Sequence, residues 1–207
     1  IFFILILFHS YRIDFGNSVS SIRPTSIHIS LNALIHNYQQ TVLHNPTHPM
    51  IAVVKANAYG HGSAKVAQTL QNLGVHYFGV SLIEEGIALR DNGITKNIII
   101  MGGLYPQSLP YITPYRFIVT IDSPDTAIMV NEYFKKQQLK IPVHIKIDTG
   151  MSRLGFNTDQ FKWFCENLRE LRSLEIYGIF SHYSHADHCD RSFCDMQVQH
   201  FQECLTF

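Results

Sequence analysis

The feature that most constrains the fold is a regular alternation of short apolar runs with longer segments that carry apolar residues at helical spacing. The predicted strands are 51–54, 77–81, 97–101, 117–121, 143–148 and 176–182, and the predicted helices after them are 63–73, 82–91, 125–138, 157–172 and 192–207. Strand–helix units that repeat about every 25 to 30 residues favour a parallel sheet covered by helices. The fold class is therefore α/β, and a (β/α)8 barrel, the TIM barrel, fits best.

The predicted barrel is incomplete. A complete eight-unit barrel takes roughly 250 residues, whereas the 157 residues from Ile51 to Phe207 supply about six β/α units. The last predicted helix reaches the final residue with no glycine or proline after it, and we interpret this as a chain that stops within an element.

The chain begins with a wholly apolar segment, residues 1–8. This segment is far shorter than the roughly 20 residues that a membrane-spanning helix needs. No basic residue precedes it and no clear small-residue cleavage site follows it. We interpret residues 1–22 as an extension or linker of uncertain meaning. We expect the truncated barrel domain to occupy residues 23–207, with a brief strand and then a helix capped by Ser30 at its start.

Charge and cysteine content narrow the function classes. Sixteen basic residues balance sixteen acidic ones, so the chain lacks the net positive charge that attracts nucleic acids or anionic membranes, and a small-molecule substrate is the better expectation. The four cysteines, Cys165, Cys189, Cys194 and Cys204, all fall in the last quarter of the chain. This distribution predicts no disulfide framework and agrees with a cytoplasmic location.

A lysine after the first predicted strand is the first candidate for chemistry. The apolar residues 51–54 bring Lys55 to the carboxyl end of the strand, before a turn that contains Gly60 and Gly62. Active sites of (β/α)8 barrels lie at these strand ends. Burial there disfavours the charged form of an amine, which suits it to Schiff-base chemistry, and Tyr59 is close enough to stack on it or bond to it. The alternative is a lysine whose ammonium group extends to solvent.

A second group of reactive side chains comes from the predicted strand 143–148. If its side chains alternate between faces, then His144, Lys146 and Asp148 line the barrel interior. The turn after this strand brings Arg153 back over the mouth of the barrel. The alternative is a structural ion pair between Asp148 and Arg153, with Lys146 exposed.

A third candidate, His182, ends the predicted strand 176–182. Its alternative interpretation is a histidine that is satisfied within the core. The nearby side chains of His185, His188, Cys189 and Cys194 have the chemistry of zinc ligands. Because neither a CxxC pair nor an HExxH helix accompanies them, a zinc-binding module is only an outside choice, and we expect no metal.

Three stretches of the sequence resemble alanine racemases. Residues 52–62, AVVKANAYGHG, resemble the segment of that family that carries the pyridoxal-phosphate lysine. Residues 146–155, KIDTGMSRLG, and residues 181–187, SHYSHAD, are similar to two further segments. All three occur in the family's order and at predicted strand ends.

The resemblance implies a fold and an activity. The fold is the amino-terminal barrel of alanine racemases, here without the carboxyl-terminal β domain. The activity is interconversion of L-alanine and D-alanine through a pyridoxal 5'-phosphate aldimine, which supplies D-alanine for peptidoglycan. The full-length form is then a cytoplasmic homodimer whose active site is shared between subunits.

The resemblance also assigns roles to five residues. Lys55 holds the cofactor and is one catalytic base, and Tyr59 is expected to contact the cofactor. Arg153 bonds the phenolic oxygen of the cofactor, and His182 lies beneath its ring. Lys146 corresponds to a lysine that many members carry as a carbamate, an anion that would orient the Arg153 guanidinium.

Two alternatives for the function stay open. The resemblance places the second base and the phosphate contacts beyond residue 207, so we expect the chain as given to be inactive by itself. Because residues beyond that point largely decide the width of the pocket, one alternative is a racemase for another small amino acid such as serine. The other alternative is a catalytically inactive truncated remnant.

Overall fold

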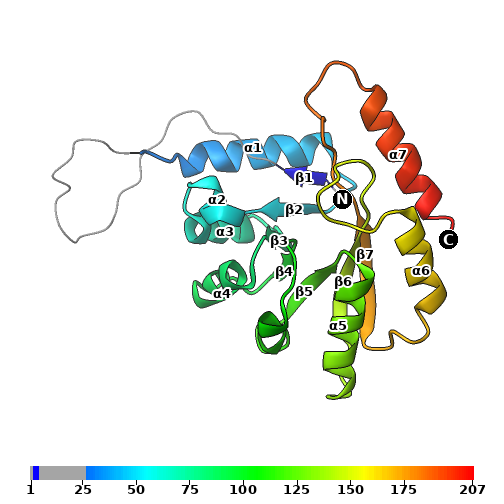
Figure 1. Ribbon diagram of the computed structural model, residues 1–207. Coiled ribbons are helices and arrows are strands. Elements are labelled where there is room, and N and C mark those ends of the chain that lie inside the picture. The colour runs from blue at the N-terminus through cyan, green and yellow to red at the C-terminus, as the bar shows by residue number, and fades with distance from the viewer. Residues whose placement is uncertain (1, 5–26) are drawn as a thin grey trace. The chain divides into compact units, whose positions relative to one another are not determined.

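The structure, a computed structural model, describes residues 2–4 and 27–207. The chain forms two compact units, with the boundary after Ile98. Within each unit, parallel strands alternate with helices along the chain (Figure 1), which confirms the predicted α/β class. Apart from residues 2–4, the predicted extension or linker over residues 1–22 lies outside the described residues, as does the boundary at residues 22 and 23.

The first unit contains a parallel sheet and its covering helices. Its elements are β1 (Phe2–Ile4), α1 (Leu31–His44), β2 (Met50–Val53), α2 (Lys55–Tyr59), α3 (Ser63–Asn72), β3 (Tyr77–Val80) and α4 (Ile83–Asp91). β2 pairs in parallel with β1, where Ile51 lies opposite Phe3, and with β3, where Ala52 lies opposite Phe78. The strand β1 was not predicted, because its apolar run was interpreted as part of an extension.

Helix α1 begins as predicted. The N–H of Ala33 donates to the Ser30 hydroxyl oxygen at 3.2 Å, so Ser30 is the N-cap. Leu34 is fully buried, and the Tyr38 hydroxyl donates to the Leu73 carbonyl at 3.4 Å. An apolar face and one polar contact thus join α1 to the end of α3.

The second unit repeats the strand–helix pattern. Its elements are η1 (Pro106–Tyr111), β5 (Phe117–Ile121), α5 (Pro124–Lys135), β6 (Ile141–Lys146), α6 (Thr158–Asn167), β7 (Leu174–Phe180) and α7 (Ser192–Cys204). The strand before them, β4 (Asn97–Ile100), contains the boundary between the units. β6 pairs in parallel with β5 and β7, so that Thr120, His144 and Gly178 lie in one row across the three strands.

Several element bounds in this unit differ from the prediction. The strands β6 and β7 each begin and end two residues earlier than predicted, and α5 and α7 each end three residues earlier. Helix α6 ends at Asn167 rather than at residue 172. Beyond it, the N–H groups of Glu170 and Leu171 donate to carbonyls three residues earlier, which forms tight turns instead of a further helical turn. The short helix η1 was missed because its two prolines are typical of a loop.

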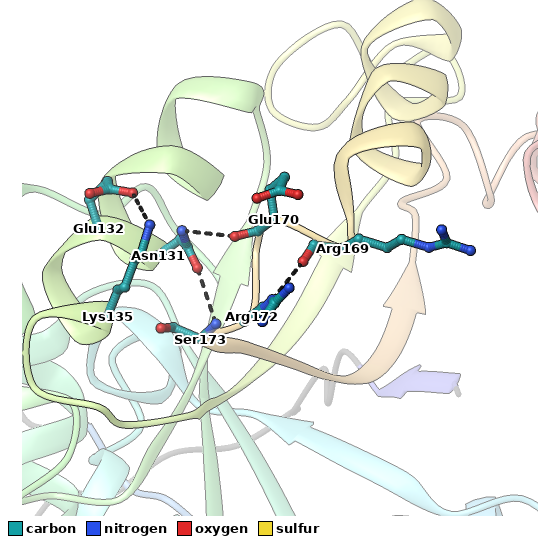
Figure 2. A network of polar contacts seen from close by, with 7 residues as sticks. All are labelled: Asn131, Glu132, Lys135, Arg169, Glu170, Arg172 and Ser173. Carbon is teal, nitrogen blue, oxygen red and sulfur yellow. Dashed lines mark hydrogen bonds and ion pairs between the residues drawn. The ribbon is translucent and has the colours of Figure 1, made fainter.

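A buried amide organises the amino-terminal ends of β6 and β7. Asn131 of α5 is 3% exposed. Its side chain donates to the Glu170 carbonyl at 3.4 Å and accepts from the Ser173 N–H at 3.1 Å (Figure 2). The Ser173 carbonyl in turn accepts from the N–H of Ile141, the first residue of β6, at 2.8 Å. Asn131 therefore links α5 to the starts of both strands.

Apolar side chains from the strands, from α5 and α6 and from the loop after β6 fill the core of the second unit. Residues with at most 1% exposure include Phe117, Val119, Ile121, Phe134, Val143, Ile145, Phe156 and Phe164. All four cysteines are free. No helix in the part of the chain that the structure describes has the length and apolar character needed to cross a membrane.

Candidate active site

In the first unit, Lys55 lies directly after the carboxyl end of β2. The strand ends at Val53, and the N–H of Val54 still donates to the Gly79 carbonyl of the neighbouring strand β3 at 2.8 Å. The Lys55 side chain is half-buried. Its Nζ lies 5.9 Å from the centre of the Tyr59 ring, within range of a cation–π contact. The structure thus brings together the first two predicted site residues.

The backbone after Lys55 turns in the left-handed sense. Ala56, Asn57 and Ala58 have φ values of 50°, 55° and 53°, and Tyr59 follows with 54°. An L-residue in this conformation costs roughly 1–2 kcal/mol, so the surrounding contacts must hold the turn. The glycines at positions 60 and 62 predicted a turn here, but the sequence did not predict its handedness.

Glu85 of α4 supplies such contacts. One carboxylate oxygen accepts from the N–H of Ala56 at 2.6 Å, and the other accepts from the N–H groups of Ser81 and Leu82 at 2.8 and 3.1 Å. This side chain therefore ties the residue after Lys55 to the end of β3 and the start of α4. Burial, and secondarily the charge of Glu85, raise the pKa of Tyr59. Glu85 was not predicted from the sequence, although an acidic residue in the first turn of a helix is a recognisable capping signal.

In the second unit, Lys146 is the last residue of β6 and is only 6% exposed. Its Nζ lies 5.1 Å from the centre of the ring of Phe180, its pairing partner on β7. The alternative of an exposed Lys146 is therefore wrong. A lysine that is buried at a strand end is a candidate for specific chemistry rather than for solvation.

His144 lies two residues before Lys146 on the same strand. It is 4% exposed, and a Cβ atom placed on Gly178 would come within 3.2 Å of its Nε2. The imidazole ring thus occupies space that the glycine of β7 leaves open. Burial lowers the pKa of His144 because the charged form would lose its solvation.

A closed loop follows β6. The N–H of Phe156 donates to the Lys146 carbonyl, and the Phe156 carbonyl accepts from the N–H of Asp148, both at 2.9 Å. At Gly155, which has a φ of 127°, an added Cβ would lie 2.6 Å from the Asp148 nitrogen. Only glycine allows the returning chain to approach the strand this closely.

Arg153 projects from this loop and is exposed. Asp148, the alternative partner considered for it, instead accepts from the N–H groups of Gly150 and Ser152 at 2.9 and 3.0 Å. Within residues 27–207, Arg153 makes no ion pair with Asp148. The guanidinium group is therefore presented to solvent at the carboxyl end of β6.

His182 lies two residues after the end of β7, and its side chain is exposed. The interpretation as a core histidine is therefore wrong. The rings of His185 and His188 are 4.3 Å apart. However, no group of three or more His, Cys, Asp or Glu side chains in the described part of the chain could hold a metal ion, so the zinc alternative has no support.

Gln197 of α7 was not predicted from the sequence either. This residue is 2% exposed, and its amide contacts both strand ends: it donates to the Thr149 hydroxyl and to the His182 carbonyl. No motif marks it, because these partners are 48 and 15 residues away in the sequence.

The predicted site residues thus form two sets. Lys55 and Tyr59 belong to the first unit, and Lys146, Arg153 and His182 belong to the second, at the ends of the neighbouring strands β6 and β7. Reactive side chains at the carboxyl ends of parallel strands define a domain of the (β/α)8-barrel enzyme class. The family model described as "Alanine racemase, N-terminal domain" matches residues 29–207, and the chain belongs to this family.

Similar proteins agree with this assignment. The alanine racemase of Geobacter sulfurreducens is 39% identical over 183 residues, which is 86% of this chain and 48% of that protein. The alanine racemase of Nostoc sp. is also 39% identical, over 86% of this chain and 47% of its own length. The chain therefore spans about half the length of the curated relatives it matches.

Solved structures give the same result. The alanine racemase from E. faecalis matches with a TM-score of 0.81 and 32% identity, over 91% of this chain and 52% of that one. The alanine racemase of Clostridium difficile 630 matches with a TM-score of 0.75 and 30% identity, over 82% of this chain and 46% of that one. The predicted fold, an incomplete (β/α)8 barrel of the alanine racemase amino-terminal type, is confirmed.

Proposed function

We propose that the chain is the lysine-bearing part of an alanine racemase, an isomerase that interconverts L-alanine and D-alanine with pyridoxal 5'-phosphate. The observation that carries the proposal is the position of Lys55, a half-buried amine directly after a barrel strand, beside the Tyr59 ring. The relatives from Geobacter sulfurreducens and Nostoc sp. are both alanine racemases, which supports alanine as the substrate.

The chemistry of the strand ends fits this cofactor. An amine at a strand end suits the aldehyde group of pyridoxal phosphate. The exposed Arg153 guanidinium suits an anionic oxygen, and His182 adds a flat ring at the end of β7. When bound, the cofactor supplies an electron sink that makes the α-proton of the amino acid acidic.

In this proposal, Lys55 removes or returns the proton at the α-carbon on one face of the amino acid. Racemisation needs a second base on the opposite face, because a single base would return the proton to the face from which it came. We assign this second base to a partner subunit of a homodimer. A carbamate on Lys146 would place an anion at the strand end from which the Arg153 loop begins.

The side chain of the substrate is the least constrained part of the proposal. The histidine racemase from Leuconostoc mesenteroides shares the fold, with a TM-score of 0.77 at 24% identity. The fold alone therefore does not select the substrate. A racemase for another small amino acid such as serine is the second candidate.

The test is chemical labelling of the lysine. Pyridoxal phosphate is added to the chain, the complex is reduced with borohydride, and the modified lysine is identified by peptide mass spectrometry. We expect modification at Lys55, its loss in Lys55→Ala, and no change in Lys65→Ala, which alters an exposed lysine of α3. Modification at another lysine, or at none, would contradict the proposal.

A further inference from the structure

All four hydrogen-bonding positions of the buried Gln197 amide are used. Its nitrogen donates to the His182 carbonyl at 2.9 Å and to the Thr149 hydroxyl at 3.2 Å. Its oxygen accepts from the N–H and the hydroxyl of Ser184 at 3.1 and 3.3 Å. Because a backbone carbonyl contacts one end of the amide and a backbone N–H contacts the other, only one orientation of the amide satisfies both.

The hydrogen bonds continue from Gln197 to Ile147, the residue after β6, and the donor and acceptor of each bond are defined. The Ser181 hydroxyl donates to the Ile147 carbonyl at 2.8 Å, so its oxygen is left to accept. The Thr149 hydroxyl accepts from Gln197 and lies 2.8 Å from the Ser181 oxygen. Thr149 is therefore the donor to Ser181, and a single chain of donors runs from Gln197 to the Ile147 carbonyl.

This chain of hydrogen bonds joins the two segments that carry Arg153 and His182. Thr149 belongs to the closed loop that presents Arg153, and His182 and Ser184 belong to the segment after β7. Gln197 comes from α7 and touches both segments. Its removal would leave the His182 carbonyl and the Ser184 N–H without their partner, and the two segments would no longer be tied to α7 at this point.

We propose that Gln197 is a positioning residue for the cofactor, because it holds the Arg153 loop and the His182 segment in one arrangement. This inference rests on the proposed function, in which Arg153 and His182 contact pyridoxal phosphate. Gln197 itself contacts neither reacting atoms nor cofactor in this proposal and acts only through the two segments.

The main variant is Gln197→Met, which keeps the volume of the side chain and removes its hydrogen bonds. Gln197→Glu keeps the acceptor for Ser184 but loses both donors, and it serves as a second variant should Gln197→Met fail to fold. Asn131→Leu is the matched control, because Asn131 is also a buried amide bonded to backbone groups beside β7 but at its other end.

Two measurements test the proposal. Pyridoxal phosphate is titrated into each purified chain, and amide hydrogen exchange is followed at Gly150, Ser152 and Ser184 without the cofactor. We expect both Gln197 variants to weaken cofactor binding by about tenfold or more, as the loss of buried hydrogen bonds implies, and to accelerate exchange at these amides. We expect Asn131→Leu to change neither, although it lowers the thermal midpoint.

The outcomes separate the two proposals. Unchanged exchange and cofactor affinity within twofold in the Gln197 variants would overturn the positioning role, as would an equal loss of affinity in Asn131→Leu. If the unsubstituted chain fails to bind pyridoxal phosphate at Lys55, the proposed function fails, and this inference fails with it even where exchange at the three amides accelerates.

Discussion

Asn131 and Gln197 are both buried carboxamides bonded to backbone groups next to β7, but they serve opposite ends of that strand. Asn131 bonds the turn that leads into β7, where Figure 2 shows its partners Glu170 and Ser173. Gln197 bonds the segment that leaves β7 and the loop that leaves β6. In barrel enzymes the amino-terminal face contributes stability and the carboxyl-terminal face carries the chemistry. Similar hydrogen bonds therefore have different consequences at the two ends.

The connecting segments at the two ends of β7 also differ, in their length and in the side chains that they expose. On the amino-terminal side, a short hydrogen-bonded turn joins α6 to β7. On the carboxyl-terminal side, the connections are longer and present the exposed side chains of Arg153 and His182. A packed turn transmits little to the proposed site, whereas a displaced loop moves residues assigned to cofactor binding.

The largest effect is expected at the carboxyl-terminal end, for Gly155→Ala. The added Cβ would lie 2.6 Å from the Asp148 nitrogen and 2.8 Å from the Ile147 carbonyl carbon, both backbone atoms, at a φ of 127°. We expect a loss of about 3 kcal/mol or more in the free energy of unfolding, measured in urea. Gly103→Ala is the control, since a Cβ atom added to Gly103 would meet nothing within 4 Å. Equal stability of the two variants would show that the loop closes without close backbone contact.

The next effect is expected at the amino-terminal end, for Asn131→Leu. The Ser173 N–H loses its acceptor in a buried environment, which costs about 2 kcal/mol of unfolding free energy. Labelling of Lys55 by pyridoxal phosphate and borohydride should be unchanged in conditions where the variant is folded. Reduced labelling in the folded variant would break the comparison, because it would give the amino-terminal end a role in cofactor binding.

The free energy of unfolding should depend on pH through His144, which lies within β6. Because burial lowers the pKa of His144 in the folded chain, the unfolded chain binds more protons once the pH falls below the ordinary histidine value of about 6.5. The free energy of unfolding should therefore fall as the pH is lowered through the window between the two pKa values. We expect His144→Asn to flatten this decline and the exposed His200→Asn to leave it in place. An unchanged decline in His144→Asn would assign it to other groups.

The smallest effect is expected for the ion pair between Lys135 and Glu132, drawn in Figure 2 beside the Asn131 contacts. The charged atoms are 3.7 Å apart, and both side chains are more than half exposed. Solvent screening limits such pairs to roughly 0.3 kcal/mol. Glu132→Gln should therefore leave the urea midpoint nearly unchanged, and a loss comparable with that of Asn131→Leu would show that the pair contributes to the amide network.

Much of the fold could be predicted from the sequence, because apolar runs and helical spacing depend on neighbouring residues. The strand β5 was placed correctly, and helix α3 differs by one residue at its end. The predicted end of α6 was wrong, since tight turns with hydrogen bonds to carbonyls three residues earlier replace the last predicted helical residues. Local patterns therefore predict the position of a helix or strand better than its ends, which depend on tertiary contacts.

The candidate site was predicted only in part, because some of its residues belong to local motifs and others act through distant partners. Lys55 and Arg153 belong to contiguous motifs, so the sequence names them directly. Glu85 and Gln197 act through partners up to 29 and 48 residues away, and only the folded chain brings these partners together. The handedness of the turn after Lys55 was also beyond local propensity, because alanine and tyrosine rarely adopt a positive φ.

The left-handed turn after Lys55 favours residues of D configuration over the L residues that occupy it. The φ and ψ values of residues 56–58 are close to the mirror image of a right-handed helix, the region that D-amino acids prefer. In a chemically synthesised chain, D-alanine at position 56 or 58 would therefore relieve strain rather than create it. Among the genetically encoded residues, glycine also relieves this strain, but it gives up the rigidity that keeps the backbone beside Lys55 in one conformation.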